Sequence, residues 1–153
     1  MAGRKHFVLD TNIMLDDPKA MMEGYDDNDV YITGTTLQEL DKIKSTGSGA
    51  SYNARKCCKI LDDLRKQGNI LQGVRLPNKG RLFVEPNGVN KEYLPVGFSL
   101  DSPDNRIIST CVYLNKKMRE KHLSKVILVT NDISLRINAT VCGIKAQEYR
   151  NDI

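Results

Sequence analysis

The sequence contains no tryptophan, and aromatic residues make up only 6% of it. A protein that recognises nucleic acid by stacking bases on an aromatic platform needs more of these side chains. The chain also holds only two histidines, and neither lies near a cysteine at the spacing of a zinc site. Base stacking on aromatics and zinc chemistry are therefore not favoured as the basis of its function.

Long apolar stretches are also missing. No segment approaches the roughly 20 apolar residues that cross a membrane, and the N-terminal MAGRKHFVLD lacks the apolar centre of a signal peptide. No C-x-x-C pair occurs among the cysteines, which we interpret as reduced thiols. These absences predict a cytoplasmic protein that is not associated with a membrane.

The composition fits one soluble domain with a hydrophobic core, since 40% of the 153 residues are hydrophobic and 27% are charged. Short apolar runs at 6–10, 30–32 and 125–130 are typical of buried strands, and helical periodicity fills segments between them. Strands that alternate with helices predict a three-layer α/β/α sandwich around a central parallel sheet. We expect a single domain over 1–153, with a hairpin insertion at about 70–98, where glycine, proline and asparagine are frequent.

Four acidic residues stand where predicted strands end or predicted helices begin. Asp10 ends the first strand and Asp132 lies just past the strand at 125–130, while Glu39 and Asp104 fall in the early turns of helices. In parallel α/β sheets, ligands bind outside the carboxyl ends of the strands. We therefore expect the four carboxylates to meet at this edge of the sheet.

Carboxylates that meet in one place repel each other, and some of them then hold protons at neutral pH. One or two Mg²⁺ or Mn²⁺ ions would relieve this repulsion, because these hard cations prefer carboxylate and water oxygens. With four acids in one site, the net charge of +4 leaves the remaining surface basic. A basic surface around a metal site suits a polyanionic substrate, so metal-dependent chemistry on a phosphodiester is the leading hypothesis.

Other polar residues surround these acids. Hydroxyl and amide groups are expected to orient the carboxylates or to hold water, and they belong to Thr11, Asn12, Asn105, Thr130 and Asn131. Basic side chains are candidates for binding substrate phosphates, and they are Arg136, Lys42, Lys44, Arg55 and Lys56. A solvated helix face is the alternative interpretation of the basic residues that flank the polar loop at 45–51.

Helix capping is the competing explanation for the acids. Asp104 follows Ser102-Pro103 in a typical helix start, and Glu39 stands three residues after Thr36, as in a capping box. Asp10 and Asp132 are also placed to cap a turn after a strand. A further helix start is predicted at Asp16-Asp17-Pro18. Because all four acids stand at strand ends or helix starts that would face the same edge of the sheet, we favour a shared functional site over four separate caps.

The segments around these acids resemble the four acidic motifs of the PIN domain family. They are Leu-Asp-Thr-Asn at 9–12, Leu-Gln-Glu-Leu-Asp at 37–41, Asp-Asn-Arg-Ile at 104–107 and Thr-Asn-Asp at 130–132. Within the family, FVLDTNIMLDDP and TNDISLRINA are most similar to the PIN domain that precedes PhoH-like ATPases. The resemblance implies a ribonuclease that hydrolyses phosphodiester bonds with metal-activated water. Its catalytic, metal-binding acids would be Asp10, Glu39, Asp104 and Asp132.

The resemblance also implies partners. Single-stranded RNA is the expected substrate, and a PhoH-like ATPase domain, an antitoxin or a second copy of the chain are the candidate protein partners. An alternative is an RNA- or protein-binding regulatory module attached to a PhoH-like ATPase or helicase. The toxin of a toxin–antitoxin pair is another. A phosphatase or receiver-like protein also gathers acids at strand ends, but we cannot place the lysine that it requires.

Overall fold

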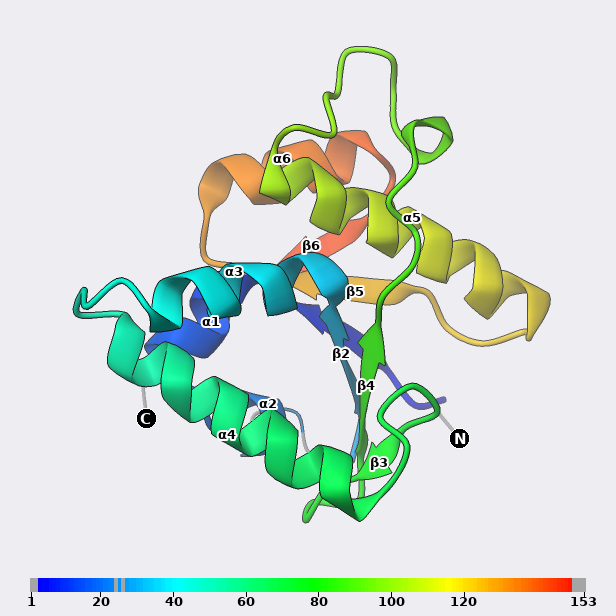
Figure 1. Cartoon of the computed structure of the whole chain (residues 1–153). Coiled ribbons are helices and arrows are strands. Elements are labelled where there is room, and N and C mark those ends of the chain that lie inside the picture. The colour runs from blue at the N-terminus through cyan, green and yellow to red at the C-terminus, as the bar shows by residue number, and fades with distance from the viewer. Residues whose placement is uncertain (1–2, 24, 26, 150–153) are drawn as a thin grey trace.

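A six-stranded sheet forms the centre of the computed structural model, which describes residues 3–23, 25 and 27–149 (Figure 1). The strands are β1 (His6–Leu9), β2 (Asp29–Thr33), β3 (Val74–Arg75), β4 (Arg81–Glu85), β5 (Val126–Val129) and β6 (Lys145–Gln147). Their order is β3-β4-β2-β1-β5-β6, and every described pairing is parallel except that of β3 with β4. All residues of β1, β2 and β5 are buried, as expected for parallel strands that are covered on both faces.

Helices cover both faces of the sheet. They are α1 (Thr11–Asp16), α2 (Ala20–Glu23), α3 (Gly34–Lys44), α4 (Ser51–Gln67), the short 3-10 helix η1 (Lys91–Tyr93), α5 (Pro103–Glu120) and α6 (Ile133–Val141). Phe7 and Leu9 of β1 pack into one core with residues of α1 to α4, whereas Val8 packs into a second core with residues of α5 and α6. Figure 1 shows these two groups of helices on either side of the sheet. This alternation divides the hydrophobic core into two halves and confirms the predicted three-layer α/β/α sandwich.

Short connections bring helix N-termini to the carboxyl edge of the sheet. β1 ends at Leu9 and α1 begins at Thr11, while β2 leads directly from Thr33 into α3. β5 ends at Val129, and α6 follows from Ile133. α3 contacts both α1 and α5, so elements from both halves of the chain meet around it.

Two local predictions differ from the structure. The helix expected to start at Asp16-Asp17-Pro18 is present as the short helix α2, which begins slightly later, at Ala20, whereas α1 over Thr11–Asp16 was not predicted. Burial of Ile13 and Met14 against the sheet holds this earlier turn in place. In the segment 70–98, β3 and β4 are antiparallel, but β4 also pairs in parallel with β2. The second strand of the expected hairpin is therefore part of the central sheet.

The described helices include none that is both long and apolar enough to span a membrane. Cys57, Cys58, Cys111 and Cys142 are free thiols. Burial raises the pKa of all four thiols, and it raises the pKa of Cys57 to about 12. These thiols are therefore protonated at neutral pH and pack as small apolar side chains.

Candidate functional site

Asp10 stands at the carboxyl end of β1, with only 4% of its surface exposed. Its backbone N–H donates to the carbonyl of Val129 at 3.0 Å, which ties the end of β1 to the end of β5. The Thr130 hydroxyl donates to Asp10 Oδ2 at 2.8 Å. Although Asp10 occupies the N-cap position of α1, its side chain makes no capping hydrogen bond. Helix capping therefore does not explain this carboxylate.

Glu39 lies on α3 and reaches toward α1. The cap of α3 is Thr33, whose hydroxyl accepts from the Thr36 N–H at 3.1 Å. The capping box expected between Thr36 and Glu39 is therefore wrong, because the helix begins earlier than the sequence pattern indicates. Glu39 Oε1 instead accepts a hydrogen bond from the hydroxyl of Thr11. A contact at 2.9 Å between the Thr11 and Thr36 hydroxyls supports this arrangement.

Asp104 and Asp132 occupy the N-termini of α5 and α6. Ser102 caps α5 by accepting from the Asn105 N–H at 3.3 Å, so half-buried Asp104 is not the capping residue. Asp132 does cap its helix, since Oδ1 accepts from the Leu135 N–H at 3.2 Å.

Thr130 links the two acids that follow strands. Its hydroxyl, besides donating to Asp10, accepts from the backbone N–H of Asp132 at 3.1 Å. The residue is fully buried, so these bonds fix the direction of the hydroxyl.

The four carboxylates influence one another electrostatically. The pKa of Asp10 is raised to about 6, chiefly by burial, while the hydrogen bond from Thr130 lowers it and the negative charges of Asp104 and Glu39 add smaller increases. The pKa of Asp104 is also raised, first by burial and then by the charge of Asp132. Interactions of this kind require carboxylates that lie near one another. The structure therefore brings Asp10, Glu39, Asp104 and Asp132 to one edge of the sheet.

The chemistry of this group fits a hard divalent cation. Carboxylate oxygens with nearby hydroxyls are the ligand set that Mg²⁺ and Mn²⁺ prefer, and a cation would offset the repulsion that adds to the effect of burial on the pKa of Asp10. The described part of the chain nevertheless holds no group of three acidic, histidine or cysteine side chains arranged to hold an ion. Binding would thus require the carboxylates to close inward. Asp132 is exposed, and Glu39 and Asp104 are half-buried, so their side chains are less confined than that of Asp10.

The flanking polar residues divide into two groups. Thr11 and Thr130 contact the acids directly through their hydroxyls. The side-chain amides of Asn105 and Asn131 bind backbone groups outside the acidic group. Asn105 donates to the carbonyl of Ser99, and Asn131 accepts from the N–H of Tyr149. Asn12 is exposed at the start of α1. Thr36, which the sequence analysis placed only as a helix cap, joins the hydroxyl network beneath Glu39.

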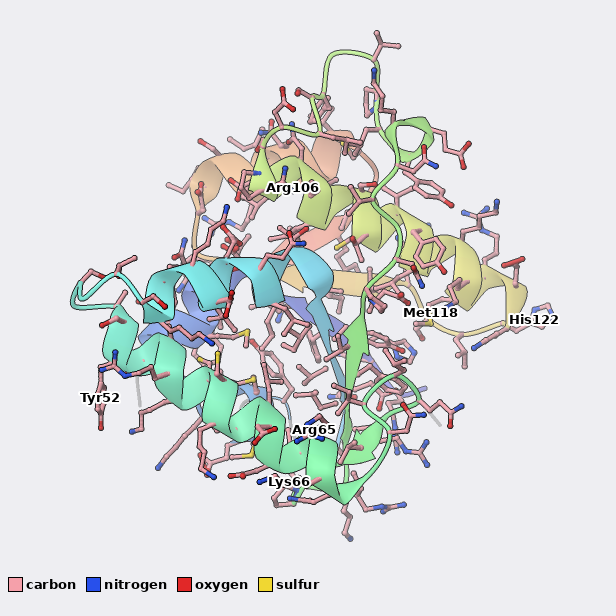
Figure 2. All side chains as sticks on the ribbon, in the orientation of Figure 1. Tyr52, Arg65, Lys66, Arg106, Met118 and His122 are labelled. Atoms are coloured by element: carbon pink, nitrogen blue, oxygen red, sulfur yellow. The ribbon has the colours of Figure 1, made fainter. Side chains whose placement is uncertain are left out.

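Most of the five predicted phosphate-binding cations already have partners. Arg136 donates to the carbonyl of Thr130 at 2.9 Å and pairs with Glu148 at 3.2 Å. Lys44 pairs with Asp41 at 2.8 Å, and Lys56 lies 5.4 Å from the ring centre of Tyr52. Figure 2 shows Tyr52 on the outer side of α4. Arg55 donates to Ser51 Oγ at 3.3 Å. Lys42 is the one that lines a pocket beside Glu39.

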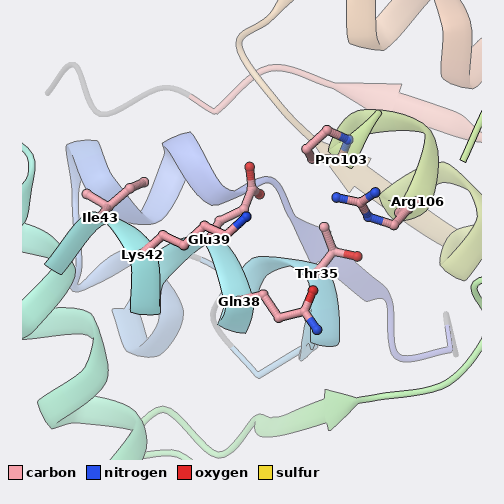
Figure 3. Close-up of a pocket in the computed structure, with 7 residues that line it drawn as sticks. All are labelled: Thr35, Gln38, Glu39, Lys42, Ile43, Pro103 and Arg106. Atoms are coloured by element: carbon pink, nitrogen blue, oxygen red, sulfur yellow. The ribbon is translucent and has the colours of Figure 1, made fainter. Parts of the chain in front are cut away.

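This pocket, which we call the α3–α5 pocket, has a volume of about 160 Å³ (Figure 3). Its lining residues are Thr35, Gln38, Glu39, Lys42, Ile43, Pro103 and Arg106. The sequence analysis missed Gln38 and Arg106. Arg106 stands in the Asp-Asn-Arg-Ile segment, and Gln38 precedes Glu39, so both were visible within the motifs. Their meeting depends on the contact between α3 and α5, which no local pattern reveals.

Comparison with known proteins gives consistent results. A family model described as PIN domain matches residues 7–150. Protein PhoH2 of Bacillus subtilis is 34% identical over 149 residues, which cover 97% of this chain and 34% of that protein. Protein PhoH2 of Mycolicibacterium smegmatis is 34% identical over 145 residues, which cover 94% of this chain and 32% of that protein. The chain thus spans about a third of the length of the curated relatives it matches.

A solved structure shares the fold. A domain of a functionally unknown protein from Methanocaldococcus jannaschii superimposes with a TM-score of 0.58 at 18% sequence identity. The match covers 97% of this chain and 94% of that one. The two chains therefore share the same overall fold.

Proposed function

The chain belongs to the PIN domain family, and from this premise we propose that it is a ribonuclease that hydrolyses RNA phosphodiester bonds with Mg²⁺ or Mn²⁺. One observation carries the proposal. Asp10 is buried at the carboxyl edge of the sheet, and its pKa is raised to about 6, chiefly by this burial and in smaller part by the charges of Asp104 and Glu39. Proteins rarely gather carboxylates in this way unless the site binds a cation or moves a proton.

Asp10, Glu39, Asp104 and Asp132 are the residues that would hold the metal. A divalent cation at such a site lowers the pKa of water and offsets the negative charge of the phosphodiester. The protein's own part is to hold the carboxylates in place. Thr130 orients Asp10 and Thr11 orients Glu39, each through a hydroxyl that donates to the carboxylate. Lys42, beside Glu39, supplies positive charge for an incoming phosphate.

The proposal is tested by cleavage of single-stranded RNA in the presence of Mn²⁺. We expect cleavage that EDTA abolishes and products that carry 5′-phosphate and 3′-hydroxyl ends. Glu39→Gln should lower the rate roughly a hundredfold or more, because loss of a residue that only supports a ligand already costs about 10- to 100-fold. Asp41→Asn, on the same helix but paired with Lys44 at its surface, is the matched control and should leave the rate unchanged. Cleavage by Glu39→Gln at the wild-type rate would sink the assignment.

A second candidate function is a module that holds RNA without cutting it and regulates an attached PhoH-like ATPase or helicase. The observation in its favour is that, among the described residues, no three acidic, histidine or cysteine side chains are arranged to hold a metal ion. In the same assay this function predicts RNA binding without cleavage under any Mg²⁺ or Mn²⁺ concentration. Cleavage that depends on Glu39 excludes it as the main role.

Thr130→Val tests how the acids are held. The substitution removes the hydroxyl that donates to Asp10 and accepts from the N–H of Asp132. We expect Mn²⁺ affinity at pH 7.5 to fall about 10- to 100-fold, as for other residues that orient metal ligands. Isothermal titration calorimetry measures the effect. Thr140→Val, which removes an exposed hydroxyl on α6, is the control. Equal affinity in wild type and Thr130→Val would show that Thr130 has no part in the site.

A further inference from the structure

The α3–α5 pocket combines features that the four acids do not explain. Ile43 and Pro103 supply apolar walls, while Gln38, Lys42 and Arg106 supply polar groups around them. Figure 3 shows the guanidinium of Arg106 extending from α5 toward α3, the helix that carries Glu39. Glu39 belongs both to the acidic group and to the pocket lining, so a ligand in the pocket would lie next to the reacting phosphate.

Arg106 is held at Nη1, whereas no hydrogen bond within the described part of the chain engages Nε or Nη2. Nη1 donates to the carbonyl of Leu100 at 2.7 Å and to that of Asp101 at 3.3 Å. Nε is buried and has no hydrogen-bond partner, and the residue forms no ion pair within the described part of the chain. A buried donor without a partner is unfavourable, and most such donors in proteins are satisfied. Because Nε is shielded from solvent in this structure, an acceptor brought by a ligand would satisfy it once the Arg106 side chain turns Nε toward the pocket.

We propose that the α3–α5 pocket binds one base of the RNA beside the cleaved bond and prefers guanine. This inference rests on the proposed function, since it assigns the pocket to the same substrate. The Nε–Nη2 edge of an arginine is a fork of two parallel donors that matches the O6 and N7 acceptors of guanine. The side-chain amide of Gln38 offers an acceptor for the N–H groups on the other edge of the base. Unstacked bases of single-stranded RNA are open to such contacts.

A phosphate fits the pocket less well than a base does. A phosphate gains nothing from the apolar walls of Ile43 and Pro103, whereas the faces of a base pack against them. The carboxylate of Glu39 also repels a phosphate but not a neutral base. Lys42 is exposed at the rim of the pocket, where it is placed to contact the phosphate of the same nucleotide.

RNA binding measured without cleavage tests the inference. The probes are fluorescently labelled oligouridine and the same oligomer with one central guanine or adenine, titrated with the whole chain in EDTA and followed by anisotropy. Wild type should bind the guanine-containing RNA about 5- to 100-fold more tightly than the other two. Arg106→Lys keeps the charge but loses the fork, so this preference should disappear while affinity for oligouridine is kept. Arg65→Lys, an exposed arginine of α4, is the control and should behave as wild type (Figure 2).

Gln38→Ala is the second variant, because Arg106 also anchors the loop before α5. Gln38 is exposed and makes no hydrogen bond within the described part of the chain, so the substitution should leave folding unchanged and reduce the guanine preference. Two results with wild type would overturn the inference: no binding of these RNAs, or equal binding of all three. A third would be an Arg106→Lys variant that loses affinity equally for all three RNAs and whose affinity depends less steeply on salt concentration, by about one charge. The last result would identify a phosphate contact.

The outcome is separable from that of the nuclease proposal. Guanine preference that depends on Arg106, without cleavage in Mn²⁺, supports the base pocket and overturns the nuclease. Cleavage that depends on Glu39, without any base preference, supports the nuclease and overturns the base pocket.

Discussion

Replacing Asp10 with asparagine is expected to reduce metal-dependent RNA cleavage by about a thousandfold or more, because residues that act as a unit each carry most of the catalytic effect. Asn keeps the shape of the side chain and an oxygen that can accept from Thr130, but it removes the charge at the most buried position of the acidic group. The measurement is the initial rate of cleavage of single-stranded RNA with Mn²⁺ at pH 7.5.

Asp16→Asn is the control for this variant. Asp16 is an exposed acid at the end of the same helix, so its replacement should leave the rate within a factor of about two, as for most surface changes that lie outside a site. If Asp10→Asn retains a rate comparable to that of the control, Asp10 has no catalytic part and the acidic group has another purpose.

The same substitution is expected to stabilise the metal-free protein at neutral pH. The pKa of Asp10 is raised in the folded chain from 3.8 to about 6, chiefly by burial. A carboxyl with a raised folded pKa contributes stability that is fully present below pH 3.8 and is lost as the pH rises through about 6. At pH 7.5 wild type has lost roughly 3 kcal/mol in this way, since one pKa unit corresponds to 1.36 kcal/mol. Asn carries no charge and avoids this loss.

Thermal unfolding in EDTA measures the stabilisation. At pH 7.5 the Tm of Asp10→Asn should exceed that of wild type by roughly 5–10 °C, and the difference should shrink toward pH 4. Adding Mn²⁺ should raise the Tm of wild type much more than that of the variant, because only a protein that binds the ion is stabilised by it. A variant that is less stable than wild type at pH 7.5, or a difference that does not change with pH, contradicts the electrostatic account of Asp10.

Parts of this fold were predictable because local sequence determines them. β1 and β5 are parallel strands buried on both faces, so they are continuous apolar runs that the sequence displays directly. The positions of Asp10 and Asp132 at the carboxyl edge follow from those strands. Contacts between distant segments were not predictable in the same way. β4 joins the sheet beside β2, and this pairing depends on where the chain returns after α4 rather than on the pattern at 70–98.

At the site too, the sequence alone does not determine which residue caps each helix. The sequence allowed capping as an alternative for Glu39 and Asp104, yet neither residue caps its helix, because Thr33 and Ser102 do so. Asp132, in contrast, does cap α6. The exact first residue of a helix decides these roles, and helix ends are the part of a fold that sequence patterns locate least well. Arg106 was missed for a related reason, since carbonyls of a preceding loop set its orientation.

The central claim is that the four acids form a divalent metal centre. An anomalous difference map from crystals soaked in Mn²⁺ tests it most directly. We predict a peak at roughly 2.0–2.2 Å from a carboxylate oxygen of Asp10, with at least one further oxygen from Glu39, Asp104 or Asp132 directly or through water. The peak should vanish in Asp10→Asn. A map in which the acids are ordered and no peak lies among them, or one in which the peak survives in Asp10→Asn, would contradict the claim.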